Sequence, residues 1–365
     1  MVKTKEHSPP LRLWISALVL GLLGGFHFGY HLVLTNPSEN RWSIYVSLLY
    51  FGSFFGAFFI QPTADRLGRK YAVLISSSGQ ALAVAVSMLS YFVDSHILYA
   101  FSRFMLGFFQ AITVGITPMY ISECSPPSCR GIISLSTALL VHVSIIFSSI
   151  LASPQILGTI TLWWILYLFE FIVFVIAIGG LLLLPESPSY LHARGDANGA
   201  SQSLSFYRGI SGCELDKALE TMSNSANSTN AVGLLRLVRD SETRGRAFTG
   251  SVVMFSALTS GNAVINAYAF SIFLTVGLDR TVASWACVGI AAIMVLGVGL
   301  STVVIERFGR RPLLLITLSC ILVINCTIVT LMFLFQLDQT PIYSILLIAV
   351  ICLFSLVFAM GKELI

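Results

Sequence analysis

The stretch that decides the fold is Asp65-Arg66-Leu67-Gly68-Arg69-Lys70, a short charged phrase between two long apolar runs. A second copy lies in the later half of the chain, again between two apolar runs, and reads Glu306-Arg307-Phe308-Gly309-Arg310-Arg311. A charged loop that recurs in this setting indicates two related membrane-embedded halves. The basic residues suit the anionic inner surface of a bilayer, and each glycine suits a tight turn.

The composition excludes an ordinary soluble domain. Hydrophobic residues make up 56% of the chain and charged residues only 10%, whereas about a quarter of a soluble protein is charged. The mean hydropathy is +0.86. The net charge of +4 is small and does not indicate nucleic-acid binding.

Ten apolar stretches are long enough to cross a bilayer, which takes about 20 residues each. They are residues 12–35, 43–62, 71–92, 97–121, 131–151, 163–184, 248–273, 282–304, 313–335 and 342–361. The sequence therefore predicts an all-α polytopic membrane protein. Most basic residues fall in alternate connections, so the positive-inside rule predicts a cytosolic N-terminus.

One long polar segment separates six of these spans from the other four. It predicts an N-terminal six-helix bundle over 1–185, a cytosolic linker with short helices over 186–247, and an incomplete four-helix bundle over 248–365.

Several motifs occur in the order in which one family carries them. They are Gly25-Phe26-His27-Phe28-Gly29-Tyr30, the first charged loop, Ser102-Arg103-Phe104, Pro118-Met119-Tyr120-Ile121-Ser122-Glu123, Pro185-Glu186-Ser187-Pro188 and the second charged loop. The chain resembles the sugar porters of the major facilitator superfamily, which include the facilitative hexose transporters. The resemblance implies two pseudo-symmetric helical bundles, with about ten of twelve membrane helices present.

In that family, a charge network on the cytosolic side holds one state of the transporter. Carried over by position, the resemblance implies a gating network of Asp65, Arg66, Arg69, Glu123, Arg130, Glu186, Glu306 and Arg310. Such pairs would form in one state and break in the other. The alternative is that these residues only anchor loops at the membrane surface.

Sugar recognition needs neutral hydrogen-bonding side chains within the membrane, because each buried sugar hydroxyl must replace its water partners. The seventh span offers the best cluster, with Ser260, Asn262, Asn266 and Tyr268, and Gly261 is expected to loosen the helix there. Thr137 stands in the fifth span, where many members of the family place glutamine. The alternative is ordinary hydrogen bonding between helices.

Two departures from the family leave the sugar open. Thr137-Ala138 and Ala257-Leu258 replace glutamines that many glucose transporters carry. The seventh span instead resembles the second class of hexose transporters, which includes fructose carriers.

Other polar residues lie within apolar runs. His27 and His31 are four positions apart and can share one helix face, which is weak evidence for a metal or proton site. Glu170 in the sixth span is expected to pair with Arg103. Asn325 is interpreted as a local helix contact.

The chain ends soon after the tenth span, where the family continues with two more. We therefore expect a C-terminally truncated form with impaired transport. The predicted function is facilitative transport of a hexose, glucose or fructose, by alternating access, without enzymatic chemistry, cofactor or metal. The expected partners are the sugar and the lipid bilayer, without nucleic acid, and the expected location is the plasma membrane. The alternatives are a transport-incompetent regulatory paralogue and a proton-coupled sugar or polyol carrier.

Overall fold

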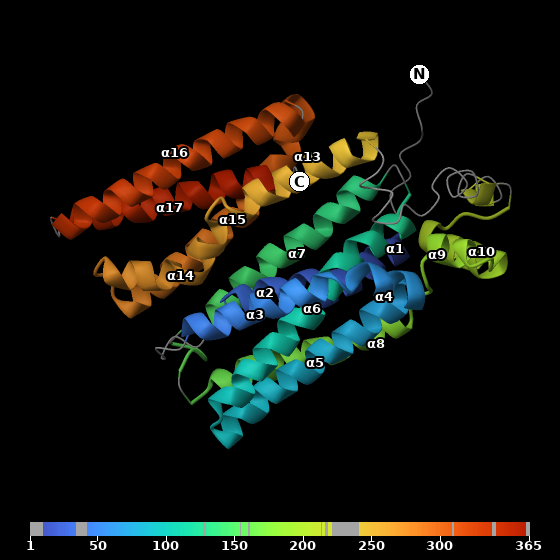
Figure 1. The fold of residues 1–365 in the computed structure, drawn as a ribbon, viewed down its shortest axis with the longest axis horizontal. Coiled ribbons are helices and arrows are strands. Elements are labelled where there is room, and N and C mark those ends of the chain that lie inside the picture. The colour runs from blue at the N-terminus through green and yellow to red at the C-terminus, as the bar shows by residue number, and fades with distance from the viewer. Residues whose placement is uncertain are drawn as a thin grey trace. The chain divides into compact units, whose positions relative to one another are not determined.

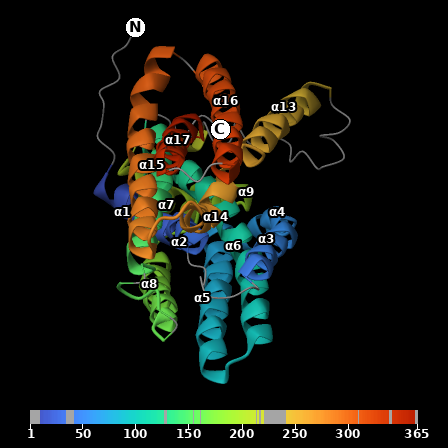
Figure 2. The same cartoon turned by 90° about the vertical axis from the view of Figure 1, so that its left-hand side faces the viewer.

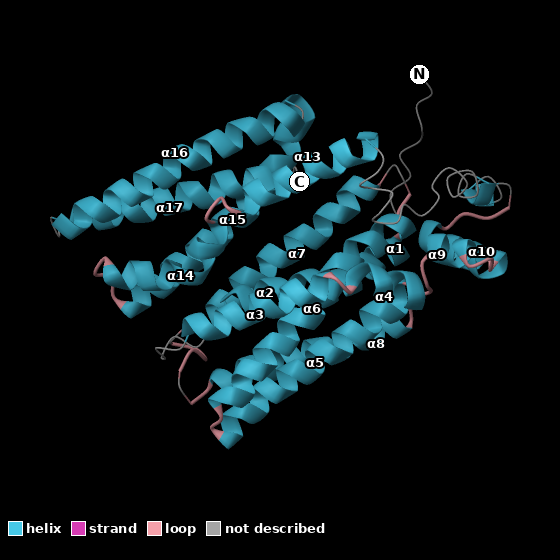
Figure 3. Ribbon diagram, viewed as in Figure 1, coloured by secondary structure: helices cyan, strands magenta, loops and turns pink. Residues whose placement is uncertain are grey.

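The computed structural model describes residues 10–33, 42–126, 129–153, 155–159, 161–212, 214–215, 218–220, 241–308, 310–337 and 341–362. Within these ranges the regular structure is helical and contains no strand (Figure 3). The chain divides into two compact units. The first comprises Met1–His31, Thr35–Ser144 and Thr159–Asn230, and the second comprises Leu32–Leu34, Ile145–Gly158 and Ala231–Ile365. The predicted boundaries at 185 and 247 stay predictions.

Figure 1 traces the helices in chain order. Those up to residue 208 are α1 (Leu11–Gly21), the π-helix η1 (Leu22–Phe26), α2 (His27–Val33), α3 (Trp42–Ala57), α4 (Ile60–Leu67), α5 (Arg69–Val93), α6 (His96–Cys124), α7 (Arg130–Leu151), α8 (Trp163–Leu182), α9 (Pro188–Ala193) and α10 (Ala197–Arg208). The later ones are α13 (Ser241–Leu258), α14 (Asn262–Thr275), α15 (Arg280–Phe308), α16 (Arg310–Leu337) and α17 (Pro341–Lys362).

Among the described residues, seven helices are long and apolar enough to cross a membrane, or eight if α3 and α4 are one span bent by 49°. Each predicted span coincides with one helix or with two or three consecutive helices. The span predicted over 248–273 is the pair α13 and α14, and the span predicted over 131–151 is α7. Large apolar side chains such as Phe54, Ile176 and Leu322 are exposed, which suits contact with lipid.

The α5–α6 hairpin shows how short-range chemistry sets the turns. Asp94 adopts the left-handed conformation that ends α5, with φ 51°, and short polar side chains tolerate that region better than most. Ser95 then caps α6, since its hydroxyl accepts a hydrogen bond from Leu98 N at 3.4 Å. The two long helices consequently lie side by side, as Figures 1 and 2 show.

Small and hydroxyl-bearing residues hold α6 against its neighbours. The Gly107 Cα lies so close to the Leu49 carbonyl of α3 that a side chain would not fit. Towards α5, the Gln80 amide donates to Thr113 Oγ1 at 2.6 Å, and Thr113 Oγ1 donates to Ser76 Oγ at 2.8 Å. Helices in a membrane usually associate through close packing and interhelical hydrogen bonds, because the hydrophobic effect does not drive their association within lipid.

In the second unit, α14, α15, α16 and α17 share an apolar core. Phe273, Met294, Ile351 and Phe354 are each at most 2% exposed within it. This core holds α14, the helix that follows the break between α13 and α14.

Candidate functional site

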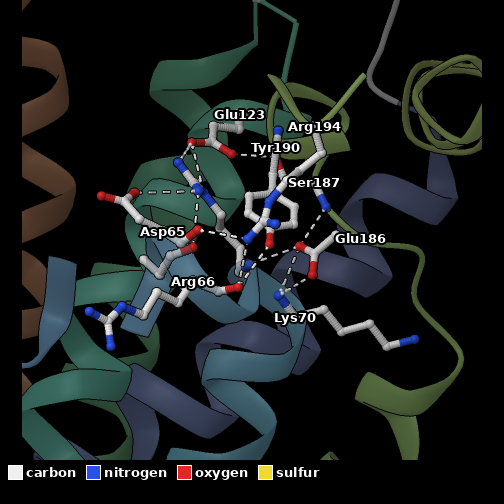
Figure 4. A network of polar contacts seen from close by, with 10 residues as sticks. Asp65, Arg66, Lys70, Glu123, Glu186, Ser187, Tyr190 and Arg194 are labelled. Carbon is white, nitrogen blue, oxygen red and sulfur yellow. Dashed lines mark hydrogen bonds and ion pairs between the residues drawn. The ribbon is translucent and has the colours of Figure 1, made fainter. Parts of the chain in front are cut away.

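Glu186 lies in the connection between α8 and α9 and caps the N-terminus of α5 (Figure 4). Its Oε1 accepts hydrogen bonds from Arg69 N and Lys70 N, both at 2.9 Å, and its Oε2 accepts a second one from Lys70 N at 3.1 Å. The first N–H groups of a helix lack partners within the helix and carry partial positive charge. A carboxylate from a distant part of the chain supplies both the acceptor and the opposite charge.

The Arg69 side chain points the other way, to Glu123 at the end of α6. Its Nε and Nη2 donate to Glu123 Oε1 at 3.1 and 2.9 Å, and its Nη1 donates to the Ala64 carbonyl at 3.2 Å. The Ser187 hydroxyl donates to the other oxygen of Glu123. Arg69 also lies 3.9 Å from Asp65, a looser pair because the Asp65 side chain is 59% exposed. We refer to Arg69, Lys70, Glu123, Glu186 and Ser187 as the Glu186 network.

Helix α9 packs against the end of α4 and against Arg69 of this network. The Tyr190 hydroxyl donates to the Arg66 carbonyl at 3.2 Å, and Arg194 Nη2 donates to the same carbonyl at 2.8 Å. The guanidinium groups of Arg69 and Arg194 lie 5.4 and 5.3 Å from the centre of the Tyr190 ring. Cation–π contacts at this range stabilise both cations.

Partial burial raises the pKa of Glu186 above its usual value, and this effect outweighs its hydrogen bonds. The backbone N–H groups of Ser187, Lys70 and Arg69, and the charge of Arg69, act in the opposite direction.

The structure brings together only part of the predicted gating set. Arg69, Glu123 and Glu186 meet directly, and Asp65 lies at the edge. The side chains of Arg66 and Arg130 are exposed, and in the described part of the chain neither forms an ion pair. The side chains of Glu306 and Arg310 lie outside those that the structure describes. Ser187 and Tyr190 were not predicted as members of the network, although Ser187 belongs to the motif that begins at Pro185 and Tyr190 follows it closely.

A second polar cluster is fully buried inside the first unit. Glu170 Oε1 of α8 lies 3.0 Å from His27 Nδ1 and 2.6 Å from His31 Nε2 of α2. These three side chains are at most 1% exposed. The predicted sharing of one face by the two histidines is confirmed, and the face meets Glu170.

Arg103 of α6 completes the cluster. It donates to the hydroxyls of Tyr99, at 3.0 and 2.5 Å, and Tyr167, and these two hydroxyls lie 2.8 Å apart. Its Nη1 lies 3.5 Å from His31 Nδ1. His31 therefore connects Arg103 to Glu170. In the part of the chain that the structure describes, no group of three His, Cys, Asp or Glu side chains has an arrangement suited to a metal ion.

The break predicted in the seventh span is confirmed. Gly261 has φ +92°, in the left-handed region that glycine enters at low cost, and it separates α13 from α14. Ser260 is buried, and Asn262 begins α14 with an Oδ1 that has no hydrogen-bond partner among the described groups. Asn325 of α16 reaches this break, because its Nδ2 donates to the Ser260 carbonyl at 2.8 Å. The helix contact expected of Asn325 therefore joins two different helices.

The remaining predicted ligands are placed as follows. Tyr268 is half-buried on α14, and the side chain of Asn266 lies outside those described. Thr137 belongs to α7 in the first unit, where it packs against Gly21 of α1.

Comparison with solved structures defines the class of protein. The fold matches that of the xylose transporter XylE from E. coli, in a partially occluded inward-open conformation, with a TM-score of 0.78 over 96% of this chain and 85% of that one. The two sequences are 17% identical, so this match concerns the fold. The chain thus has the helical fold of XylE, a protein of the major facilitator superfamily.

The chain belongs to the sugar (and other) transporter family, whose model matches residues 11–363. It is 31% identical to the facilitated glucose transporter member 2 of solute carrier family 2 from Sus scrofa, over 88% of this chain and 61% of that protein. It is 29% identical to member 11 from Homo sapiens, over 83% of this chain and 66% of that protein. The chain thus spans less than two thirds of the length of these relatives, which are transporters rather than enzymes.

Proposed function

We propose that this chain binds a hexose, glucose or fructose, and moves it down its gradient across the plasma membrane by alternating access. The observation that carries the proposal is the break at Gly261, which places buried neutral polar groups within a membrane helix of a sugar transporter family member. The relatives named as facilitated glucose transporters support a hexose as the substrate class.

The chemistry of the break suits a sugar hydroxyl. The carbonyl-type Oδ1 of Asn262 accepts hydrogen bonds and lacks a partner among the described groups, and a buried acceptor of this kind is costly unless a ligand or water serves it. Hydrogen bonds to a sugar at this place would offset the loss of water by both partners. The proposed ligands are Ser260, Asn262, Asn266, Tyr268 and Thr137.

The proposed role of the Glu186 network is to hold one state of the transport cycle from the cytosolic side. It ties α5, α6 and the N-terminus of α9 together through hydrogen bonds to the two carboxylates, which can break and re-form as a unit. Asp65, Arg66, Arg130, Glu306 and Arg310 are proposed as further members. The N-terminus is proposed to lie on the same, cytosolic side.

Uptake into liposomes tests this function. If the chain transports, the purified 365-residue protein takes up labelled D-glucose or D-fructose with saturation, stops when the two sides are equal and ignores L-glucose, and the expectation of impaired transport is then wrong. The Asn262→Ala variant should need a higher sugar concentration for half-maximal uptake. If the protein binds sugar, as measured by fluorescence or thermal shift, but no uptake occurs, the chain is a regulatory or incomplete form. If it neither binds nor carries hexose, the proposal is wrong.

A proton-coupled carrier is the second candidate, and the buried cluster of His27, His31, Glu170 and Arg103 favours it. Two imidazoles and one carboxylate in direct contact provide groups that can exchange a proton within the membrane. Coupled transport should make the external solution more alkaline during uptake and should let sugar accumulate when a proton gradient is imposed. Uptake that leaves the external pH unchanged supports the facilitative mode.

A further inference from the structure

The break between α13 and α14, in the predicted seventh span, disturbs a regular series of backbone hydrogen bonds. Thr259 N still donates to the Phe255 carbonyl at 3.0 Å, and Ile265 N donates to the Gly261 carbonyl at 3.0 Å. In an unbroken helix, the Ser260 carbonyl would accept from Val264 N. The left-handed turn at Gly261 interrupts the series at that point. In a membrane, a carbonyl released in this way costs several kcal/mol if no donor replaces the lost one.

Asn325 supplies a donor at this position. Its Nδ2 lies 2.8 Å from the Ser260 carbonyl, although the two residues stand 65 positions apart and on different helices. A Cβ added to Gly261 would lie 3.7 Å from both Asn325 amide atoms, so the amide also packs against the turn itself.

Other polar side chains of α16 behave differently. The hydroxyls of Ser319, Thr327 and Thr330 donate to carbonyls of their own helix, as such side chains commonly do in membrane helices. The Asn325 amide instead donates to a carbonyl at the break between α13 and α14, and Asn325 differs from these neighbours in this respect.

We propose that Asn325 is a positioning residue that holds the break between α13 and α14 in the geometry needed to bind the substrate. The inference rests on the proposed function, because the fixed turn carries the proposed sugar ligands Ser260 and Asn262. Without the amide, the Ser260 carbonyl loses the hydrogen bond from Asn325, and a re-formed helix would offer Val264 N in its place. That change would rotate Asn262 away from its present direction.

Two variants of Asn325 test this. Asn325→Leu keeps the branched shape and removes the donor, and Asn325→Gln keeps a donor on a side chain that is one methylene longer. Thr327→Val is the matched control, since Thr327 bonds within α16 two positions away. The first readout is hydrogen–deuterium exchange of the backbone amides around 258–265 in lipid nanodiscs, which does not depend on transport. The second is the sugar concentration for half-maximal uptake, compared with the maximal rate.

We expect Asn325→Leu to change exchange at Asn262–Val264 several-fold and to raise the half-saturating sugar concentration roughly tenfold, the loss of one hydrogen bond. The maximal rate should change less, Asn325→Gln should recover part of the affinity, and Thr327→Val should resemble the wild type. A third variant of this residue, Asn325→Ala, serves if the leucine variant does not fold.

Unchanged exchange in both the leucine and alanine variants overturns the inference. If the Asn325 variants change the exchange but the wild-type protein does not transport hexose, the positioning role is supported and the proposed function is refuted. An altered exchange with unaltered sugar affinity overturns the link between the turn and the substrate.

Discussion

The carboxylate of Glu186 occupies the space that a side chain on Gly68 would need. A Cβ built on Gly68 would lie 2.5 Å from Glu186 Oε2 and 2.8 Å from the Tyr190 ring. Gly68 also has φ 92° and ψ 171°, a region that is essentially closed to other residues. Gly68 thus serves two purposes. It allows the turn between α4 and α5, and it leaves room for Glu186, which caps α5.

We predict that Gly68→Ala destabilises the protein by about 1–3 kcal/mol through backbone strain, and further through displacement of Glu186. Gly179→Ala is the control, because Gly179 lies within α8 and a Cβ there meets nothing within 4 Å. That change should be neutral or stabilising, since alanine favours a helix. Thermal unfolding in detergent measures both. Equal melting temperatures for the two variants would contradict the account.

The membrane spans were predictable because each is a local property of about 20 residues. The break at Gly261 was expected from the resemblance to sugar porters, together with the glycine in the polar part of the seventh span. The turn of π-helix at Leu22–Phe26 was not, since nothing in that apolar run marks it. The bend after Ala57 was also missed, because the apolar residues continue through it.

The site shows the same division. The acids and bases of the first charged loop could be picked out, but their partners could not, because partners follow from tertiary packing. The sequence suggested that Glu186 meets arginine side chains, whereas it binds the backbone N–H groups of Arg69 and Lys70. Tyr99 and Tyr167 were not singled out, although their hydroxyls surround Arg103. Tyrosines are common in membrane helices, so neither carried a signal.

The pH dependence of stability should report Glu186. Its folded-state pKa lies above the value of 4.5 for the free side chain, so the folded protein binds this proton more tightly than the unfolded chain. The stabilisation is complete below about pH 4.5 and is lost as the pH rises through the folded-state pKa. Relative to the Glu186→Gln variant, the wild type should therefore lose melting temperature over that rise. A wild type that gains melting temperature relative to Glu186→Gln as the pH rises would contradict the assignment.

Arg69 should not tolerate the change to lysine. Arg69→Lys keeps the charge but cannot place two N–H groups on Glu123 Oε1 and a third on the Ala64 carbonyl. We expect a loss of about 1–2 kcal/mol in the free energy of unfolding, since hydrogen bonds to charged groups are involved. Arg66→Lys is the same substitution at an exposed side chain and should change little. Denaturant unfolding of the two variants measures both losses. Equal losses would show that the hydrogen bonds of the Arg69 guanidinium do not contribute to the free energy of unfolding.

The buried cluster should behave as one electrostatic unit. Glu170→Gln leaves the buried Arg103 without an opposite charge nearby, and Arg103→Met does the same to Glu170. Each change should therefore lower the free energy of unfolding by roughly 3–5 kcal/mol. The double variant removes both charges at once and should cost clearly less than the sum, with a coupling of roughly 1–3 kcal/mol. His31 lies between the two groups, at 2.6 Å from Glu170 and 3.5 Å from Arg103, so His31→Leu should weaken that coupling. Unfolding of the full set of variants in detergent measures each term. Costs that add to within about 0.5 kcal/mol would mean that Glu170 and Arg103 act independently, and that His31 does not connect them.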